Sequence, residues 1–337
     1  MISPLKIGVV GVGHLGQHHV RLYREMPGAQ FVGAFDADSK KSNFPTLDAL
    51  ADAVDAVSIS TPTDSHLAVA KLFLERGKHC LVEKPITNNV RDAETLVALA
   101  RQHNCVLQVG HVERFNPVLR YLNEVLTEAR FIEVHRLSPY PGRSTDIGVV
   151  LDLMIHDLDV VLSLVKSPLV SVDAVGINVL SVSEDIANAR LKFANGCVAN
   201  ITASRVSPEK MRKIRIFGKS THGAAYISLD YMKQEGQLYR MASDDATESS
   251  LIKKLLAGSS ATIVSEFGGK KILREPVPIA RDEPLKLELQ NFVDSVRHRR
   301  DPLVTGEAGK QALEVAMEIT RLCGQALPVA TGSSFKG

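Results

Sequence analysis

Residues 5–16 read LKIGVVGVGHLG, a short apolar run followed at once by three glycines. The run from Leu5 to Val10 is typical of a strand buried on both faces, and residues 14–26 are expected to form a helix. In such a unit the first glycine allows a tight turn, the second lets the backbone approach a pyrophosphate, and the third lets helix and strand pack closely. The free N–H groups at the helix N-terminus favour phosphate. The sequence therefore predicts a dinucleotide site that includes Gly11, Gly13, His14, Leu15 and Gly16.

One carboxylate bears on the choice between NAD and NADP. Asp36 follows a predicted strand over residues 30–35 and lies twenty residues after Gly16. A carboxylate at this position accepts hydrogen bonds from the adenosine ribose hydroxyls and repels the 2′-phosphate of NADP. We therefore expect NAD as the cofactor. Lys40 and Lys41 lie close enough in the sequence to keep NADP as the alternative.

Composition narrows the class of protein. The chain of 337 residues is long enough for two domains, and 45% hydrophobic with 23% charged residues is typical of a soluble globular protein. A net charge of +2 without a strong basic run predicts no nucleic-acid partner. The four cysteines are widely spaced with no C-x-x-C pair, which argues against a zinc ribbon or a disulfide framework and fits a reducing cytosol. No metal site is predicted.

Targeting signals are not expected either. The first predicted strand begins at residue 5, which leaves no room for a signal peptide. No apolar run approaches the roughly 18–20 residues of a membrane span. We expect a cytoplasmic protein with no membrane partner.

The first third of the chain alternates strands and helices, which predicts a doubly wound parallel sheet with ligands at the carboxyl ends of its strands. Only nine residues, Asn43 and Pro45 among them, separate Asp36 from Thr46, so we expect a loop instead of the usual helix there. The further predicted strands are 54–60, 79–82 and 106–110, and the further helices are 65–76 and 91–103.

Beyond residue 120 the pattern changes to an antiparallel meander preceded by one long helix over 149–165. Asn195-Gly196 between two strands is a strong hairpin signal. We therefore expect a Rossmann domain over 1–118 and an α+β domain with an open, mainly antiparallel sheet over 119–337. The predicted strands are 131–137, 170–179, 187–193, 197–204, 213–217 and 223–229, helices follow at 285–299 and 307–323, and the polar stretch 243–260 is left without an assignment.

Glu83-Lys84-Pro85 lies at the carboxyl end of a predicted strand, where α/β sheets carry their chemistry. The Lys84 ammonium can donate to a substrate hydroxyl and stabilise a developing alkoxide beside the nicotinamide. The alternative is a surface lysine before a turn-forming proline.

Asp152 and His156 are four residues apart in a strongly apolar helix, so they are expected to share one face. Buried ionisable groups are costly unless they are paired or functional. His156 suits a general base that takes the proton of an alcohol, and Asp152 can orient the imidazole or bind a neighbouring hydroxyl. A structural Asp–His pair is the alternative. The adjacent Asp157 and Asp159 are expected to cap, pair or face solvent.

The ordered motifs identify a family. The chain resembles the glucose–fructose oxidoreductase / inositol dehydrogenase / MocA family over nearly its whole length. That resemblance implies a catalytic Lys84–His156 pair with Asp152 beside it, a cofactor bordered by Ser60, Thr61, Pro62, His66 and Glu83, and dimers or tetramers built through the C-terminal sheet. Met154 departs from the glycine of many members. The motifs are Gly11-x-Gly13-x-x-Gly16, Thr61-Pro62-x-x-x-His66, Glu83-Lys84-Pro85, Arg114-Phe115-Asn116-Pro117 and Asp152-x-x-x-His156.

A finer resemblance concerns the substrate. Residues 110–117, 148–159 and 184–205 look like members that oxidise the 3-hydroxyl of UDP-N-acetylglucosamine. Such a nucleotide sugar needs cations for its diphosphate. Arg143 and Arg205 are the candidates, and Arg114 and Asn116 are further candidates for substrate binding. An inositol-type or free-sugar dehydrogenase is the alternative enzyme, and a non-catalytic NAD-binding sensor is the alternative from another class.

Overall fold

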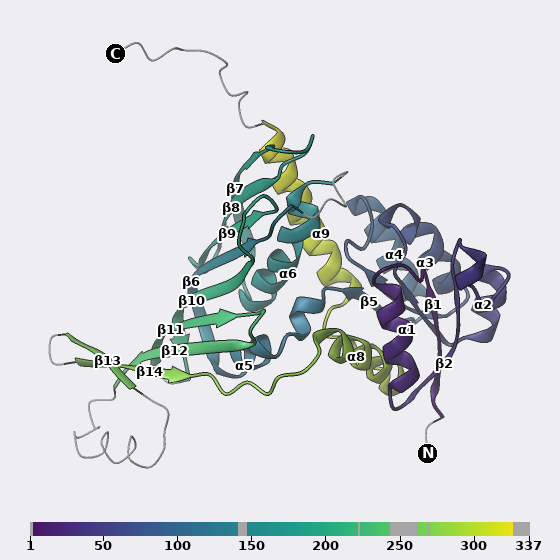
Figure 1. Cartoon of the computed structure of the whole chain (residues 1–337), viewed down its shortest axis with the longest axis horizontal. Helices are drawn as coiled ribbons and strands as arrows, with labels where there is room; N and C mark the ends of the chain where they lie inside the picture. Colours follow the sequence, from purple (N-terminus) through teal and green to yellow (C-terminus); the bar gives the residue numbers. More distant parts are fainter. Residues whose placement is uncertain (1–2, 141–146, 222, 243–261, 268–269, 326–337) are drawn as a thin grey trace, which may run out of the picture.

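The computed structural model describes residues 3–140, 147–221, 223–242, 262–267 and 270–325, which form two sheets with helices around and between them (Figure 1). The first sheet is parallel, with the strand order β2-β1-β3-β4-β5, and confirms the predicted Rossmann-type architecture. The order reverses between β1 and β3, and ligands bind at such a switch point in α/β sheets. The strands are β1 (Leu5–Val10), β2 (Ala29–Phe35), β3 (Ala56–Ile59), β4 (His79–Glu83) and β5 (Leu107–Gly110).

Helices cover both faces of this sheet. Leu22 of α1 (Gly16–Glu25) and Phe292 of α8 (Pro284–His298) share one apolar cluster with Ile7. The other face is covered by α2 (Leu47–Ala53), α3 (His66–Glu75) and α4 (Val90–Gln102). Although α8 falls within the range that we assigned to the second domain, its apolar side chains contact the first sheet. Short 3₁₀ turns are η1 (Ser39–Lys41), η2 (Thr63–Ser65) and η3 (Val112–Phe115).

The connection after β2 differs from the prediction. We expected a loop in place of a helix, but the chain forms η1 and then the short helix α2. Thr46 caps α2, because its hydroxyl accepts a hydrogen bond from Ala49 N at 3.1 Å. Asn43 and Pro45 therefore delay the helix instead of removing it.

The second sheet is open and mainly antiparallel, as predicted, with the order β13-β14-β12-β11-β10-β6-β9-β8-β7. It is not a pure meander, because β6 and β9 pair in parallel at its centre. The predicted hairpin at Asn195-Gly196 is confirmed: β8 and β9 pair antiparallel, and Gly196 has φ +82°. The strands are β6 (Leu126–Leu137), β7 (Leu169–Ile177), β8 (Ile186–Phe193), β9 (Val198–Ser204), β10 (Met211–Ser220), β11 (Gly223–Asp230), β12 (Glu235–Met241), β13 (Thr262–Phe267) and β14 (Lys270–Pro276).

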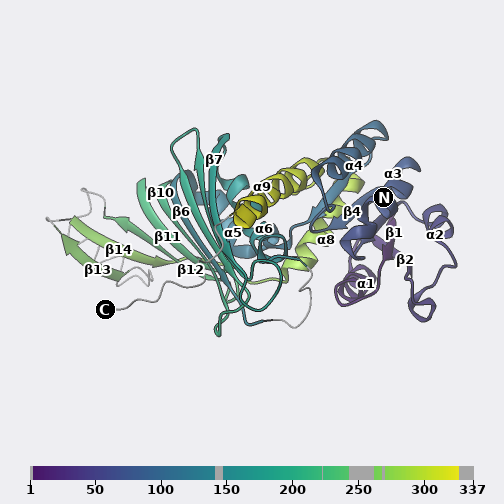
Figure 2. The ribbon, with the colours of Figure 1, turned by 90° about the horizontal axis from the view of Figure 1, so that it is seen from above.

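Three helices lie on the face of this sheet that is turned toward the first domain (Figure 2). They are α5 (Pro117–Val125), α6 (Ile155–Leu164) and α9 (Gly306–Gln325). The predicted helix over 149–165 is not one continuous α-helix, because its first turn, Val150–Met154, is π-helical and Ile155 N donates to Val150 O. Such a widened turn is frequent at functional sites.

A buried arginine joins helix α6 to the first domain. Arg136, at the end of β6, donates to both oxygens of Asp157 at 2.6 and 2.9 Å, and to Glu113 in η3 at 2.9 Å. All three side chains are at most 7% exposed. Because Asp157 directly follows His156 and η3 directly follows β5, this cluster fixes how the two domains meet at the carboxyl edge of the first sheet.

We expect Arg136→Met to destabilise the protein by about 3–5 kcal/mol, because it leaves two buried carboxylates without their cation. The shift of the urea unfolding midpoint measures this loss. Arg321→Met is the matched control: its partner Glu318 is 44% exposed, and an exposed pair contributes less than about 1 kcal/mol. Equal losses in the two variants contradict the prediction.

Candidate active site

The glycine loop has the close contacts that the sequence predicts. Gly11 has φ +84°, a conformation that favours glycine. A Cβ on Gly16 lies only 1.8 Å from Gly11 O, so helix α1 can begin this close to β1 only with glycine there. A Cβ on Gly13 meets no heavy atom within 4 Å, and His14 and Leu15 beside it are exposed. The backbone of residues 13–15 is therefore open to a pyrophosphate.

The turn after β3 lies against this loop at the switch point. Ser60 Oγ donates to Gly11 O at 2.8 Å, and Thr61 Oγ1 accepts from Ser65 Oγ at 2.6 Å. The buried His66 ring lies between two turns, with Nε2 3.0 Å from Thr61 O and Nδ1 3.0 Å from Pro85 O. The side chain of His66 thus connects the turn that begins Thr61-Pro62 with Glu83-Lys84-Pro85.

Asp36 ends β2 beside the glycine loop. Its carboxylate accepts hydrogen bonds from Val12 N at 2.5 Å and from Asp38 N at 2.8 Å. Burial raises the pKa of Asp36, but these two hydrogen bonds and Lys41 outweigh burial and hold the pKa below its usual value. Asp36 is therefore ionised at neutral pH, next to the loop that a dinucleotide would contact.

Lys84 and Asp152 meet between the domains. Lys84 Nζ donates to the backbone oxygen of Asp152 at 2.6 Å and lies 3.6 Å from its carboxylate. Burial, followed in size by the opposing effects of Asp152 and Glu83, leaves the pKa of Lys84 below its usual value. Nε2 of the buried His19 lies 3.2 Å from the Glu83 carboxylate. The end of β4 and the π-helical turn are thereby joined through a single ammonium group.

His156 lies in the same cluster. Burial and then the positive charges of Lys84 and Arg136 lower its pKa well below the usual value, so the imidazole is neutral at physiological pH. Its Nδ1 is buried and has no hydrogen-bond partner among the described residues. The ring of His111 packs against that of His156 with the planes at 90° and the centroids 6.1 Å apart.

Two of the predicted substrate residues have structural contacts. Arg114 donates to Asp159 at 3.2 Å and to Leu303 O at 3.2 Å. Asn116 is buried, accepts from Val118 N at the start of α5, and donates to Tyr231 O. Neither side chain is directed into the Lys84–His156 cluster by these contacts. Asp157 and Asp159 are both paired with arginines, which is one of the roles expected for them.

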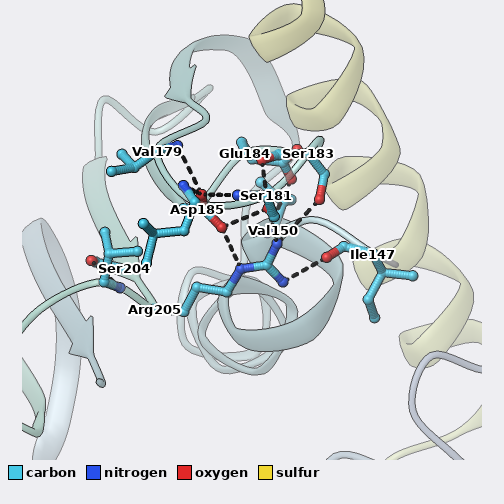
Figure 3. A network of polar contacts seen from close by, with 11 residues as sticks. Ile147, Val150, Val179, Ser181, Ser183, Glu184, Asp185, Ser204 and Arg205 are labelled. Atoms are coloured by element: carbon cyan, nitrogen blue, oxygen red, sulfur yellow. Dashed lines mark hydrogen bonds and ion pairs between the residues drawn. The ribbon is translucent and has the colours of Figure 1, made fainter. Parts of the chain in front are cut away.

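Arg205 requires a correction (Figure 3). We expected its guanidinium to bind a diphosphate, but the side chain is fully buried. It donates to Asp185 at 2.8 Å, to Ile147 O at 2.6 Å and to Ser181 Oγ at 2.7 Å. Arg205 therefore secures the segment after β7 against Ile147, just before the helical segment that carries His156. Arg143, the other candidate, lies outside the described residues, as does the stretch 243–260.

Sequence reasoning did not single out His111 or Arg136. His111 directly follows the predicted strand 106–110. Because ligands bind at the carboxyl ends of strands in α/β sheets, this position is the signal that could have identified it. Nothing local marks Arg136, because its importance comes from partners 21 and 23 residues away.

Within the described ranges, no group of three or more histidine, cysteine or acidic side chains is arranged to hold a metal ion. In the same ranges, no helix has the length and apolarity needed to cross a bilayer.

A parallel sheet with a glycine loop at its switch point, and a lysine–aspartate–histidine cluster beside it, defines a dinucleotide-dependent oxidoreductase. Residues 5–111 match the oxidoreductase family with an NAD-binding Rossmann fold, and residues 125–222 match the GFO/IDH/MocA C-terminal domain. The chain belongs to this glucose–fructose oxidoreductase / inositol dehydrogenase / MocA family.

Individual relatives agree with this membership. The chain is 35% identical over 326 residues to UDP-N-acetylglucosamine 3-dehydrogenase of Acidithiobacillus ferrooxidans, covering 94% of this chain and 96% of that protein. A solved structure of that dehydrogenase superposes with a TM-score of 0.81 at 33% identity, covering 96% and 98% of the two chains. The NAD(+)-dependent scyllo-inositol 2-dehydrogenase of Bacillus subtilis is 24% identical over 361 residues, covering 98% and 97%.

Proposed function

We propose that the protein is an NAD-dependent dehydrogenase that oxidises the 3-hydroxyl of UDP-N-acetylglucosamine, or of a related nucleotide sugar, to a ketone. The observation that carries the proposal is the contact of Lys84 with Asp152, which gathers an ammonium, a carboxylate and a neutral imidazole beside the glycine loop. The relative that acts on UDP-N-acetylglucosamine, similar over almost its whole length, supports the choice of sugar.

The cofactor side of the proposal rests on residues that fit a dinucleotide. The open backbone at Gly13 suits a pyrophosphate, and the ionised Asp36 suits two ribose hydroxyls while repelling a 2′-phosphate. Ser60, Thr61 and Pro62 form the facing turn, with His66 and Glu83 behind it. When bound, NAD supplies the acceptor for a hydride from the sugar carbon.

The protein's own part in the chemistry is the movement of one proton. Neutral His156 accepts it from the sugar hydroxyl through Nε2, because Nδ1 is buried. The Lys84 ammonium donates a hydrogen bond to the same oxygen and stabilises its negative charge as the hydride leaves. Asp152 holds Lys84, and in this proposal its carboxylate binds a neighbouring hydroxyl of the sugar.

The remaining assignments stay predictions. Arg143 lies in sequence between β6 and the catalytic helix, and we retain it as the cation for the diphosphate. The sheet face away from the helices exposes Val170, Val175, Ile177 and Phe217, which supports a homodimer or homotetramer built through that sheet. Light scattering of the purified protein tests the assembly. A cytoplasmic location is likewise still a prediction.

Cofactor choice is tested at Asp36. Asp36→Ser should weaken NAD binding roughly tenfold or more, because a charge-assisted hydrogen bond contributes about 1.5–3 kcal/mol, and it should improve NADP binding. Asp36→Asn is the matched control, since its amide oxygen can still accept the hydrogen bond from Val12 N while the negative charge is lost. This variant should also gain NADP affinity, and it should disturb the glycine loop less than Asp36→Ser does. Fluorescence titration measures both. A native preference for NADP rules out this assignment.

The catalytic pair is tested by Lys84→Ala and His156→Ala. Each should lower kcat by on the order of 10²–10⁴ while NAD binding is kept, and the double variant should lose less than the product of the two. Lys71→Ala, an exposed lysine on α3, is the control. Near-native turnover of His156→Ala removes it as the base.

The same pair sets the pH dependence. An imidazolium cannot accept a proton, and the pKa of His156 is depressed, so kcat/KM should hold to a pH below about 6.5 before it falls. At alkaline pH, kcat/KM should fall as the Lys84 ammonium loses its proton. Because the pKa of Lys84 is lowered, this fall should occur below the usual lysine pKa of about 10.4.

The substrate is tested by turnover of UDP-sugars, free sugars and inositols, followed at the NADH absorbance. UDP-N-acetylglucosamine should give a 3-keto sugar, and free N-acetylglucosamine should be far poorer, because remote diphosphate binding orients the sugar. Arg143→Ala should impair the nucleotide sugar more than the free sugar. If inositol or a free hexose turns over as well as any UDP-sugar, the inositol-type dehydrogenase replaces this proposal. NAD binding without turnover of any of them supports the sensor.

A further inference from the structure

His111 is a buried titratable side chain that the mechanism above does not use. It directly follows β5, at the same edge of the sheet as Lys84, and it is 0% exposed. Neither of its ring nitrogens has a hydrogen-bond partner among the described residues. Leaving a buried polar group unpaired is unfavourable, and an apolar ring of similar shape avoids that cost. Buried polar groups are normally hydrogen-bonded, so an unpaired one beside Lys84 and His156 calls for a functional explanation.

The unpaired nitrogens of two histidines gather at one place. The rings of His111 and His156 meet at 90° with their centroids 6.1 Å apart, and Nδ1 of His156 is also buried without a partner. Because His111 is fully buried and His156 is partly exposed, His111 lies on the inner side of the pair.

The charges around the pair keep both rings neutral. Burial, then Lys84 and Arg114, lower the pKa of His111 to about 3. His156 is faced by Lys84 at the end of β4, by His111 after β5, by Arg136 of β6 and by Arg212 of β10. The charges of the two arginines are balanced by the carboxylates of Glu113 and Asp157. No carboxylate of the described residues is bonded to His156 Nδ1, so the group that fixes which nitrogen carries the proton is to be found elsewhere around the ring.

We propose that His111 is the positioning residue for His156: through one buried water it is the hydrogen-bond partner of His156 Nδ1, and this leaves Nε2 as the proton acceptor. A water is the fitting link, because no direct hydrogen bond joins the two rings, and one nitrogen of His111 together with Nδ1 of His156 supplies the two partners that a buried water needs. The inference rests on the proposed role of His156 as the base.

Three substitutions separate shape from hydrogen bonding. His111→Phe keeps a flat ring and removes both nitrogens, His111→Asn places an amide near the position of Nδ1, and His111→Gln places one near the position of Nε2. We expect His111→Phe to lower kcat roughly 10–100-fold with NAD affinity unchanged and with a melting temperature equal to or above that of the native protein. One of the two amide variants should recover much of the lost kcat. If His111→Phe does not melt cooperatively, His111→Met takes its place, because its flexible apolar side chain fits irregular space.

Histidine ¹⁵N NMR on the NAD-bound protein gives a readout that does not depend on turnover. In the native protein His156 should carry its proton on Nδ1, and in His111→Phe the two tautomers should mix, with a shifted acid limb in the pH profile of kcat/KM. Native kcat together with an unchanged His156 tautomer in His111→Phe overturns the inference. A native protein that turns over no sugar defeats the proposed function instead, and the NMR comparison then still decides whether His111 fixes the His156 ring.

Discussion

The guanidinium of Arg136 is the interaction on which the arrangement of the site depends. A charged group with 3% of its side chain exposed is tolerated only because two carboxylates enclose it. Those carboxylates belong to the turn after the last strand of the Rossmann sheet and to the helix that carries His156. The geometry of one planar cation thus sets how His156 lies relative to the carboxyl edge of the Rossmann sheet.

The same cation shapes the chemistry nearby. Burial and then the positive charges of Lys84 and Arg136 lower the pKa of His156, so the imidazole stays neutral. A carboxylate bonded to the ring would favour the protonated form. In the mechanism we propose, Lys84 is the cation at the reacting oxygen and His156 is the uncharged base, an arrangement suited to alcohol oxidation near neutral pH.

The structural features that could be predicted from the sequence are those set by residues close together along the chain. The Rossmann strands, the glycine loop and the Asn195-Gly196 hairpin follow from local pattern and turn chemistry. The parallel pairing of β6 with β9 joins segments about 67 residues apart, and no local signal reports it. Strand β14, with the sequence KKILREP, could not be predicted, because it is highly charged and lacks the alternation of apolar and polar residues that indicates a strand. Arg205 shows the limit most clearly, since its identity suggested an anion site, and only the fold shows that the segment up to Asp185 closes over it.

Helix α8 has a consequence for synthesis on the ribosome. Its side chains Leu289, Phe292 and Val293 complete the apolar layer over Ile7 and Val9, nearly the whole length of the chain away. The first sheet emerges within the first third of translation, yet one of its faces is finished only after residue 298 has left the exit tunnel. The nascent Rossmann unit thus waits with an exposed apolar surface while the entire second sheet is made, and a chaperone that shields such surfaces would act during that interval.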